Sequence, residues 1–205
     1  MRREMEVRRL GRVEFEPAWR AMQAFNNTRG PETPDEIWLL EHEPVFTLGL
    51  AGRREHVLDP GDIPVVSCDR GGQVTYHGPG QAVAYVLLDL RRSGLGAKEL
   101  VRRLEQAAID VLDGYGIRGE RRAGMPGVYV GGAKIGAVGL RIARGCSYHG
   151  LALNADVDLA PYSRIDPCGY PGLASTRLAD HGVADRIDAV QQKLLDALRK
   201  CLTPT

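Results

Sequence analysis

Short runs of β-branched and aromatic residues, separated by glycine-rich turns, constrain the fold of this 205-residue chain more than any other feature. Seven runs have the length and composition of strands, and several follow one another at hairpin spacing. They cover residues 37–42, 45–48, 63–67, 82–90, 128–130, 134–142 and 147–154. This pattern predicts a mostly antiparallel mixed sheet.

Three further segments carry apolar residues at the 3.6-residue spacing of an amphipathic helix. The first begins near Pro17, the second runs from Leu100 to a stop at Gly114, and the third covers residues 187–201. Together with the strands, they predict an α+β fold in which helices pack on the sheet. The length favours a single domain over residues 1–205.

Charge and composition narrow the classes of function. The 27 basic and 26 acidic side chains nearly cancel, which gives no support to nucleic-acid binding. No run of about 18 apolar residues predicts a membrane span, and the charged residues 1–12 lack the apolar core of a signal peptide. The four cysteines form no C-x-x-C pair, so we expect free thiols in a reducing cytoplasm. No interface stripe stands out, and we expect a monomer.

The segment RGGQVTYHGPGQ, residues 70–81, combines glycine-bounded corners with an arginine and the pair Tyr76 and His77. An ordinary glycine-rich hairpin is the alternative reading of this pattern. The segment lacks the GK[ST] of a phosphate loop and does not open a helix, so nucleotide binding is poorly supported. Glycines let the backbone come close to a ligand, which favours a wall of NH groups beside an elongated substrate.

The segment GVYVGGAKIGAVGLR, residues 127–141, places the single lysine Lys134 among small residues on a predicted strand. Only four of the 27 basic residues are lysines, and a lysine can change its charge state on burial whereas an arginine cannot. Lys134 is therefore a candidate for chemistry. The alternative is a surface lysine whose amine reaches water.

The third segment, residues 145–172, is rich in proline in its second half and places Cys168 between Pro167 and Gly169. A free cysteine is usually a buried apolar residue, but one in such a turn is a candidate nucleophile.

Two alternatives use other residues of the same stretch. Cys146 and His149 have the spacing of metal ligands, but no matching pair completes a zinc site. A catalytic Cys–His pair would join Cys146 or Cys168 to His77 or His149.

Taken together, three blocks resemble the signature segments of the octanoyltransferase family, the lipoyl(octanoyl) transferases. These blocks are RGGQVTYHGPGQ, the GAKI run at residues 132–135 with the following AVGLR, and SYHGLALN followed by PCGY. They occur in the order and spacing of that family and cover about half of the chain, residues 70–172. A joint match of three blocks is far more specific than any one of them.

The resemblance implies a fold related to the catalytic domains of lipoate- and biotin-protein ligases, a catalytic pair formed by Cys168 and Lys134, and no cofactor. It implies octanoyl-acyl carrier protein as the donor. It implies lipoyl domains of 2-oxoacid dehydrogenase and glycine-cleavage proteins as acceptors. It also implies an acyl pocket built from the three blocks. The candidate substrate-binding residues, with His149 included, are Arg70, Gly71, Gly72, Gln73, Val74, Thr75, Tyr76, His77, Ala137, Val138, Gly139, His149, Gly150, Leu151 and Ala152.

The chemistry of acyl transfer suits these residue types. A thiolate can carry an acyl group from one thioester to another without activation by ATP. A nearby ammonium favours the thiolate, and the neutral amine of the same lysine can then take a proton from the acceptor. We therefore expect Lys134 to serve both as a charge and as a base toward Cys168. Backbone NH groups of the glycine-rich segments, helped by His77 or His149, are the candidate oxyanion donors.

Two details qualify the resemblance. Many relatives carry Asn where this chain has Asp166, two residues before the cysteine, and we expect that carboxylate to point away from the sulfur. Because both protein partners are expected to be acidic, Arg70, Arg141 and Arg144 are candidates for a basic landing surface, with a solvated strand edge as the alternative for Arg144.

Three other functions remain as rivals. An ATP-dependent lipoate- or biotin-type ligase would adenylate a free acid and would not need Cys168. A Cys–His thiol hydrolase would release free octanoate even when an acceptor is present. An acyl-binding or interaction module would show no turnover at all.

Overall fold

The computed structural model describes residues 5–203, apart from the side chain of Cys168. A seven-stranded mixed sheet with the order β1-β2-β6-β10-β9-β8-β7 forms its centre. Only β1 and β2 are parallel among the neighbouring strands of this sheet. Its strands are β1 (Glu6–Val13), β2 (Glu36–His42), β6 (Gln81–Leu87), β7 (Glu120–Arg122), β8 (Met125–Val130), β9 (Ala133–Ala143) and β10 (Cys146–Asn154).

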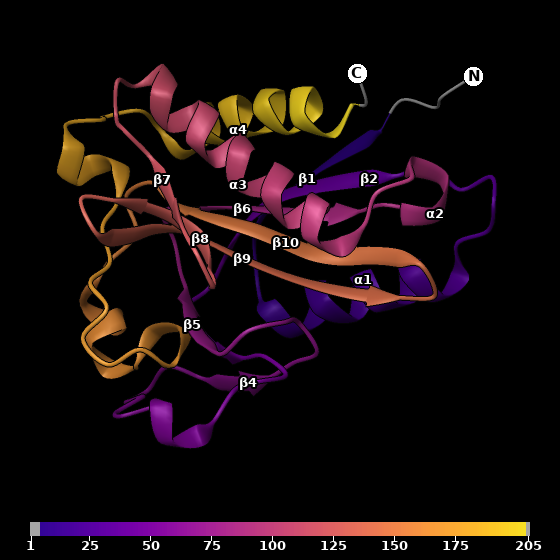
Figure 1. Ribbon diagram of the computed structural model, residues 1–205. Coiled ribbons are helices and arrows are strands. Elements are labelled where there is room, and N and C mark those ends of the chain that lie inside the picture. Colours follow the sequence, from indigo (N-terminus) through magenta and orange to yellow (C-terminus); the bar gives the residue numbers. More distant parts are fainter. Residues whose placement is uncertain (1–4, 204–205) are drawn as a thin grey trace.

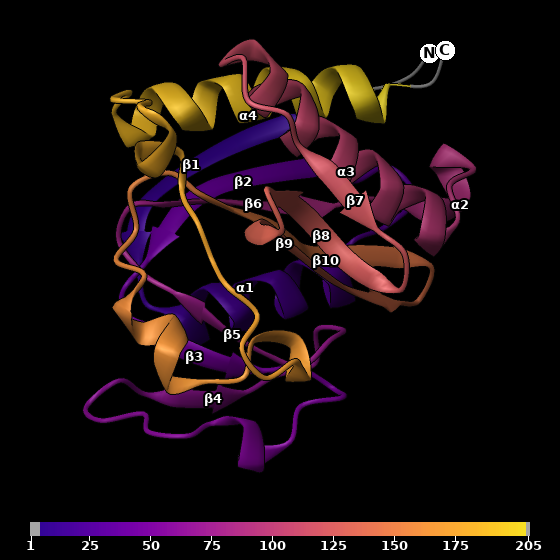
Figure 2. The ribbon, with the colours of Figure 1, turned by 60° about the vertical axis from the view of Figure 1, so that its left-hand side comes forward.

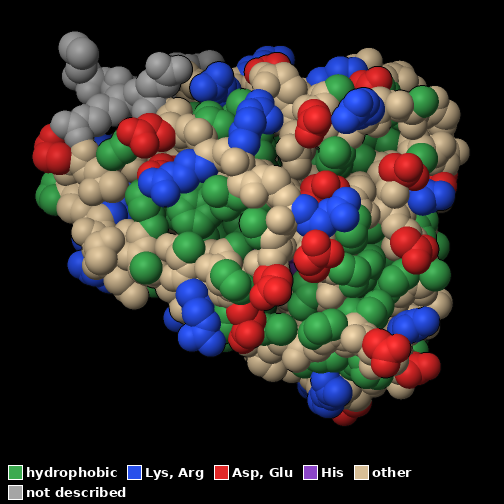
Figure 3. Space-filling model, turned by 180° about the vertical axis from the view of Figure 1, so that it is seen from behind, with side chains coloured by type: hydrophobic (Ala, Val, Ile, Leu, Met, Phe, Trp, Pro, Cys, Tyr) green, Lys and Arg blue, Asp and Glu red, His purple; other side chains and the backbone are tan. Residues whose placement is uncertain are grey.

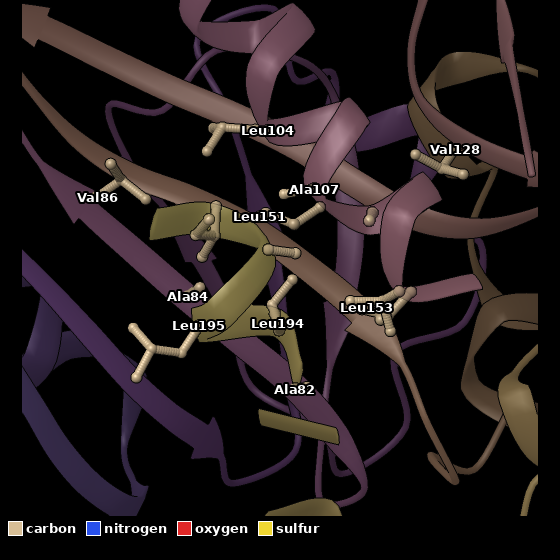
Figure 4. Packing of buried hydrophobic residues seen from close by; sticks show 14 of the residues in the cluster. Ala82, Ala84, Val86, Leu104, Ala107, Val128, Leu151, Leu153, Leu194 and Leu195 are labelled. Atoms are coloured by element: carbon tan, nitrogen blue, oxygen red, sulfur yellow. The ribbon is translucent and has the colours of Figure 1, made fainter. Parts of the chain in front are cut away.

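Helices cover both faces of this sheet (Figures 1 and 2). The helices are α1 (Phe15–Thr28), α2 (Leu90–Ser93), α3 (Ala97–Gly114) and α4 (Ile187–Leu202). Helices α3 and α4 lie together on one face, whereas α1 lies on the other. Alternate residues of β6 serve the two faces: Ala82 and Ala84 pack toward α3 and α4, and Val83 and Tyr85 pack toward α1. Figure 4 shows the first of these cores, with Leu151 and Leu153 of β10 beside Leu194 of α4.

A smaller three-stranded sheet of order β4-β3-β5 lies below the main sheet in Figures 1 and 2. Its strands are β3 (Val45–Leu48), β4 (Val65–Ser67) and β5 (Val74–His77). The segment after β10 runs beside it and includes the 3-10 turns η2 (Ala160–Arg164) and η3 (Pro167–Gly169). A hydrogen bond from the Leu58 amide to the Arg164 carbonyl (2.9 Å) and one from the Asp166 amide to the His56 carbonyl (2.9 Å) anchor this segment.

The predicted α+β class is confirmed, and so are the three predicted helices and the seven strand segments. Several boundaries were wrong: the strand predicted over residues 63–67 begins at Val65, the one over 128–130 begins at Met125, and the one over 82–90 ends at Leu87. Asp89 caps a short helix there, and its side chain accepts hydrogen bonds from the amides of Arg91 and Arg92. Strands β1, β5 and β7 were not predicted.

The surface carries charges of both signs. In the view of Figure 3, acidic and basic side chains are interspersed among apolar ones. Among residues 5–203, no helix is long and apolar enough to cross a membrane.

Candidate active site

A cavity open to solvent lies between the middle of the main sheet and the segment that leads into β5, with about 530 Å³ of empty space that includes the solvent at its mouth. Fourteen of the fifteen candidate substrate-binding residues line it. The exception is Tyr76, which packs instead into the apolar cluster around Phe46 of the small sheet. Four residues outside that set complete the lining: Phe15, Val83, Tyr85 and Lys134.

Three adjacent strands, β6, β10 and β9, form the floor of the cavity. In their register Ala137 faces Ala152, which faces Val83, and one step along the strands Gly139 faces Gly150. Because every second residue of a strand points to the same side, these residues share one face of the sheet. Their side chains are small, so space remains above the sheet where α1 does not cover it.

The glycine-rich segment forms the roof. The Gly71 amide donates to the carbonyl of Leu140 on β9 (2.8 Å), and a Cβ at Gly139 would lie only 3.1 Å from the Gly71 oxygen. Glycine at these two positions therefore lets the segment lie close to the strand. Arg70 is only 8% exposed and donates to the side chain and carbonyl of Thr47. Its proposed place on a basic landing surface was wrong, because its guanidinium points inward.

Lys134 lies at the start of β9 and is only 7% exposed, so the surface-lysine alternative was wrong. Its Nζ donates to the Pro126 carbonyl over 2.9 Å and lies 5.5 Å from the centre of the Tyr129 ring. The strand thus brings an amine to the wall of an otherwise largely apolar cavity.

The backbone of Cys168 lies in the turn η3, and its two neighbours fix where that turn sits. Pro167 and Lys134 line a second, smaller cavity with about 250 Å³ of empty space. Gly169 has φ +75°, and a Cβ there would lie 3.3 Å from the side chain of Gln73 in the roof. The fold therefore brings the Pro-Cys-Gly turn beside Lys134 and beside the main cavity, although the cysteine lies 34 positions later in the chain.

Three buried histidines lie around the same cavity. Burial lowers the pKa of His42 to about 4 and that of His77 to about 3, and it also lowers the pKa of His149. All three rings are therefore neutral at pH 7. Tyr85 donates its hydroxyl to Nε2 of His42 (2.6 Å), while Nδ1 of His42 donates to the Val13 carbonyl (3.0 Å).

His149 and His77 each have one NH group, and both NH groups are already engaged. Nε2 of His149 donates to Asp69 Oδ1 (3.0 Å), and Nδ1 of His77 donates to Gln81 Oε1 (2.7 Å). Partial burial works to raise the pKa of Asp69. Hydrogen bonds from His149, Tyr148, Gln23 and Trp19 outweigh that effect and hold the pKa well below its usual range. Neither neutral ring can donate to an oxyanion in this arrangement.

The other described cysteines lie in different surroundings. Cys68, Cys146 and Cys201 are free thiols, and burial raises the pKa of each. The Cys146 thiol faces the Arg144 carbonyl at 4.0 Å and does not line the cavity, which disfavours its pairing with a histidine. Within residues 5–203, no group of three or more His, Cys, Asp or Glu side chains is arranged to hold a metal ion.

Sequence reasoning missed several residues of the cavity. The alternation of β6 could have indicated Val83 and Tyr85, because both lie on the apolar face opposite Ala82. Phe15 precedes the predicted helix start and had no local signal. Asp69, which does not line the cavity but binds His149, was missed because a carboxylate before the arginine of the first block has no pattern of its own.

Comparison with known proteins adds an independent line of support. The sequence pattern of the family described as the lipoyl protein ligase A/B catalytic domain matches residues 15–199. An octanoyltransferase of Aromatoleum aromaticum is 62% identical over 198 residues, which cover 97% of this chain and 86% of the relative. An octanoyltransferase of Thiobacillus denitrificans is 60% identical over 196 residues, which cover 96% of this chain and 90% of the relative.

Solved structures agree on the fold. A lipoate-protein ligase A bound with ATP superposes with a TM-score of 0.78 at 16% identity, covering 98% of this chain and 86% of the ligase. A biotin protein ligase from Aquifex aeolicus superposes with a TM-score of 0.63 at 13% identity, covering 96% of this chain and 70% of the ligase. The resemblance that the three sequence blocks indicated is confirmed: the chain belongs to the octanoyltransferase family and is an acyltransferase.

Proposed function

We propose that this enzyme takes an octanoyl group from octanoyl-acyl carrier protein and passes it, through a thioester on Cys168, to the acceptor lysine of a lipoyl domain. One observation carries the proposal. A buried amine, that of Lys134, lies at the wall of a cavity with an apolar floor, beside the turn that holds Cys168. The name of the close relatives, octanoyltransferase, supports the identity of the acyl group.

The cavity supports a medium-length acyl chain as the substrate. The site is concave, and small residues on its floor leave room beside apolar side chains, as small-molecule sites usually do. Val83 and Ala152 give it an apolar floor, and burying a chain there contributes about 0.8 kcal/mol for each methylene group. A carbonyl at the Lys134 end would place the chain along the floor.

The first half of the reaction loads the enzyme. Lys134 accepts the proton of the Cys168 thiol, and the resulting thiolate attacks the carbonyl carbon of the donor thioester. The tetrahedral intermediate collapses as its bond to the carrier sulfur breaks. That sulfur leaves as a thiolate and takes the proton back from the Lys134 ammonium. The products are the octanoyl thioester of Cys168 and a free carrier thiol, with Lys134 neutral again.

The second half of the reaction transfers the octanoyl group from Cys168 to the acceptor lysine. The neutral amine of the acceptor lysine attacks the same carbonyl carbon, and Lys134 accepts the proton that the amine must lose. The bond to the Cys168 sulfur then breaks, and Lys134 returns the proton to that sulfur. An amide forms, the thiol is restored, and no phosphate or redox group is consumed. Cys168 and Lys134 therefore exchange one proton in each half of the reaction.

Backbone NH groups supply the oxyanion donors in this scheme. His77 and His149 were the side-chain candidates, but each neutral ring already donates its one NH to Gln81 or Asp69. The NH groups of the segment 70–75 other than that of Gly71, which donates to Leu140, are the donors in this scheme.

Partners and compartment follow from the same proposal. The donor is an acyl carrier protein, and the acceptors are lipoyl domains of 2-oxoacid dehydrogenase and glycine-cleavage proteins. We place the reaction in the cytoplasm, because Cys68, Cys146 and Cys201 are free thiols and a reducing compartment keeps cysteines in this form.

A transfer assay separates this proposal from its rivals. Octanoyl-acyl carrier protein and a lipoyl domain are incubated with the enzyme without ATP, and the masses of all proteins are followed. Octanoylation of the lipoyl domain is the expected result. Transfer that requires ATP and free octanoate would indicate a ligase instead. Free octanoate released in the presence of the lipoyl domain would indicate a hydrolase, and no reaction would indicate a binding module.

A further inference from the structure

An aromatic wall closes the cavity on the side away from Lys134. Val83 and Tyr85 lie on β6, two strands away from the strand of Lys134, which corresponds to about 10 Å at the usual strand spacing. Phe15 of α1 stands on this far side, 5.3 Å from the ring of His42 at the end of β2. An acyl chain that starts near Lys134 and follows the floor therefore meets Phe15 with its methyl end.

The wall is built from rings in mutual contact. The ring of Phe15 lies nearly parallel to that of His77 (centroids 6.2 Å apart, planes 6° apart) and to that of His149 (6.3 Å, 14°). The ring of Tyr85 meets that of His149 edge-on at 5.8 Å. All four side chains line the cavity and are buried.

Hydrogen bonds outside the cavity hold three of these four rings. Tyr85 is bonded to His42 (2.6 Å), His77 to Gln81 (2.7 Å) and His149 to Asp69 (3.0 Å). These bonds fix the rings beside the cavity. Phe15 has no polar atom on its ring, so its position depends on packing and on the start of α1 at that residue.

Apolar side chains lie behind Phe15. Its ring packs on Val45 and Cys68, which are both buried, and Trp19 and Val66 complete this small cluster. A smaller side chain at position 15 would therefore extend the cavity into surroundings that suit further methylene groups. A larger one would shorten it.

We propose that Phe15 sets the length of acyl chain that the enzyme accepts, acting as the stop of a slot whose other walls are fixed by hydrogen bonds. The inference rests on the proposed acyl transfer. It adds a specificity-determining residue outside the three sequence blocks.

The test compares octanoyl-, decanoyl- and hexanoyl-acyl carrier protein as donors, with transfer to a lipoyl domain as the readout. Phe15→Leu and Phe15→Ala lengthen the slot, and Phe15→Trp shortens it. The control is Phe25→Ala, because Phe25 lies on the same helix and packs on Trp38 without lining the cavity. Thermal unfolding of each variant checks its fold, and intact mass records the acyl-enzyme formed from each donor.

In Phe15→Ala we expect the ratio of kcat/KM for decanoyl over octanoyl donors to rise roughly tenfold, since two more methylene groups become buried. Phe15→Leu should move the ratio in the same direction by less. Phe15→Trp should favour hexanoyl over octanoyl, and Phe25→Ala should leave both ratios at the wild-type values.

Unchanged ratios in folded Phe15 variants, or variants that no donor acylates, would overturn the role of Phe15 while leaving the wild-type reaction intact. A wild-type enzyme that transfers no octanoyl group would instead overturn the proposed function.

Discussion

The Nζ atom of Lys134 donates a hydrogen bond over 2.9 Å to the carbonyl oxygen of Pro126, so an amine of β9 is held by the neighbouring strand β8. Gly127 makes room for this contact. A Cβ at that position would lie 2.5 Å from the carbonyl oxygen of Gly136 and 2.7 Å from Cε of Lys134, and the backbone there has φ +130°, which L side chains rarely adopt. The position of the amine thus depends on a glycine of another strand.

We propose that Lys134 acts both as a charge and as a general base, so losing either role should lower the transfer activity. We expect Lys134→Ala to lose about 10²–10⁴-fold in kcat/KM for transfer, the range typical of a lost acid–base group. Lys134→Arg should fail as well, because arginine keeps the charge but cannot release its proton. Lys193→Arg is the matched control, since Lys193 pairs with Asp185 at the surface. Full activity of Lys134→Arg would remove the general-base role.

Gly127→Ala should lower transfer although it replaces neither Lys134 nor Cys168. The added methyl group would push the lysine side chain from the Pro126 carbonyl, so kcat should fall at least tenfold while KM for the donor changes little. Gly131→Ala is the control, because Gly131 also has positive φ, but an added Cβ there would have open space within 4 Å among the described residues. Equal activity of the two variants would show that the contact with Pro126 is unimportant.

Asp166 is paired with His56, whose Nδ1 lies 3.3 Å from its Oδ2. Because His56 pairs with this carboxylate, we expect Asp166→Asn to leave the pH profile of Cys168 alkylation within about 0.3 units of the wild type. In His56→Ala the carboxylate loses its partner and can disfavour the nearby thiolate, so the profile should shift to higher pH. The measurement is the rate of alkylation by iodoacetamide between pH 6 and 9, read on the Cys168 peptide. A large downward shift in Asp166→Asn would mean that the carboxylate acts on the sulfur.

The buried histidines should make the fold acid-sensitive. The pKa of His42 falls to about 4 and that of His77 to about 3, so the unfolded chain binds more protons than the folded one below about pH 6.5. The free energy of unfolding should therefore decrease as the pH falls from about 6.5 to 4, by at most about 1.4 kcal/mol per pH unit for each histidine. Urea unfolding at pH 7.5, 6.5 and 5.5 measures this slope.

His42→Gln supplies the matched variant for that slope, since glutamine can still bond the Val13 carbonyl and the Tyr85 hydroxyl. In this variant we expect the free energy of unfolding to depend less steeply on pH, by the contribution of one histidine. A free energy of unfolding that stays constant or rises on acidification would contradict the burial of neutral rings.

The helices were predictable because their apolar spacing is regular, as in the stripe from Leu100 to Leu112 on α3. Strand β1 was not, because its EVRRLGRV sequence carries charges on both faces, which a parallel edge strand tolerates. Strand β7 has only three residues, ERR, and no apolar side chain. Local sequence patterns do not predict strands whose position is set by pairing with a neighbouring strand.

The residues of the site also fall into those that the sequence could predict and those that it could not. Glycine-rich blocks are continuous in sequence, so the residues of the roof and floor could be named together, and all but Tyr76 line one cavity. Their role in binding substrate stays a prediction. Phe15 reaches the cavity through tertiary packing of α1 against β10, and Asp69 reaches His149 in the same way, which no local pattern encodes.

The acyl-enzyme itself is the most direct test of the central claim. Wild-type protein and the Cys168→Ser, Cys68→Ser and Cys146→Ser variants are mixed with octanoyl-acyl carrier protein in the absence of ATP and acceptor, and intact masses are recorded. We expect one octanoyl group on the wild type and on the Cys68 and Cys146 variants, removable by hydroxylamine at neutral pH, and none on Cys168→Ser. An octanoyl group that persists as a thioester in Cys168→Ser, or transfer to a lipoyl domain that this variant still catalyses at the wild-type rate, would contradict the account.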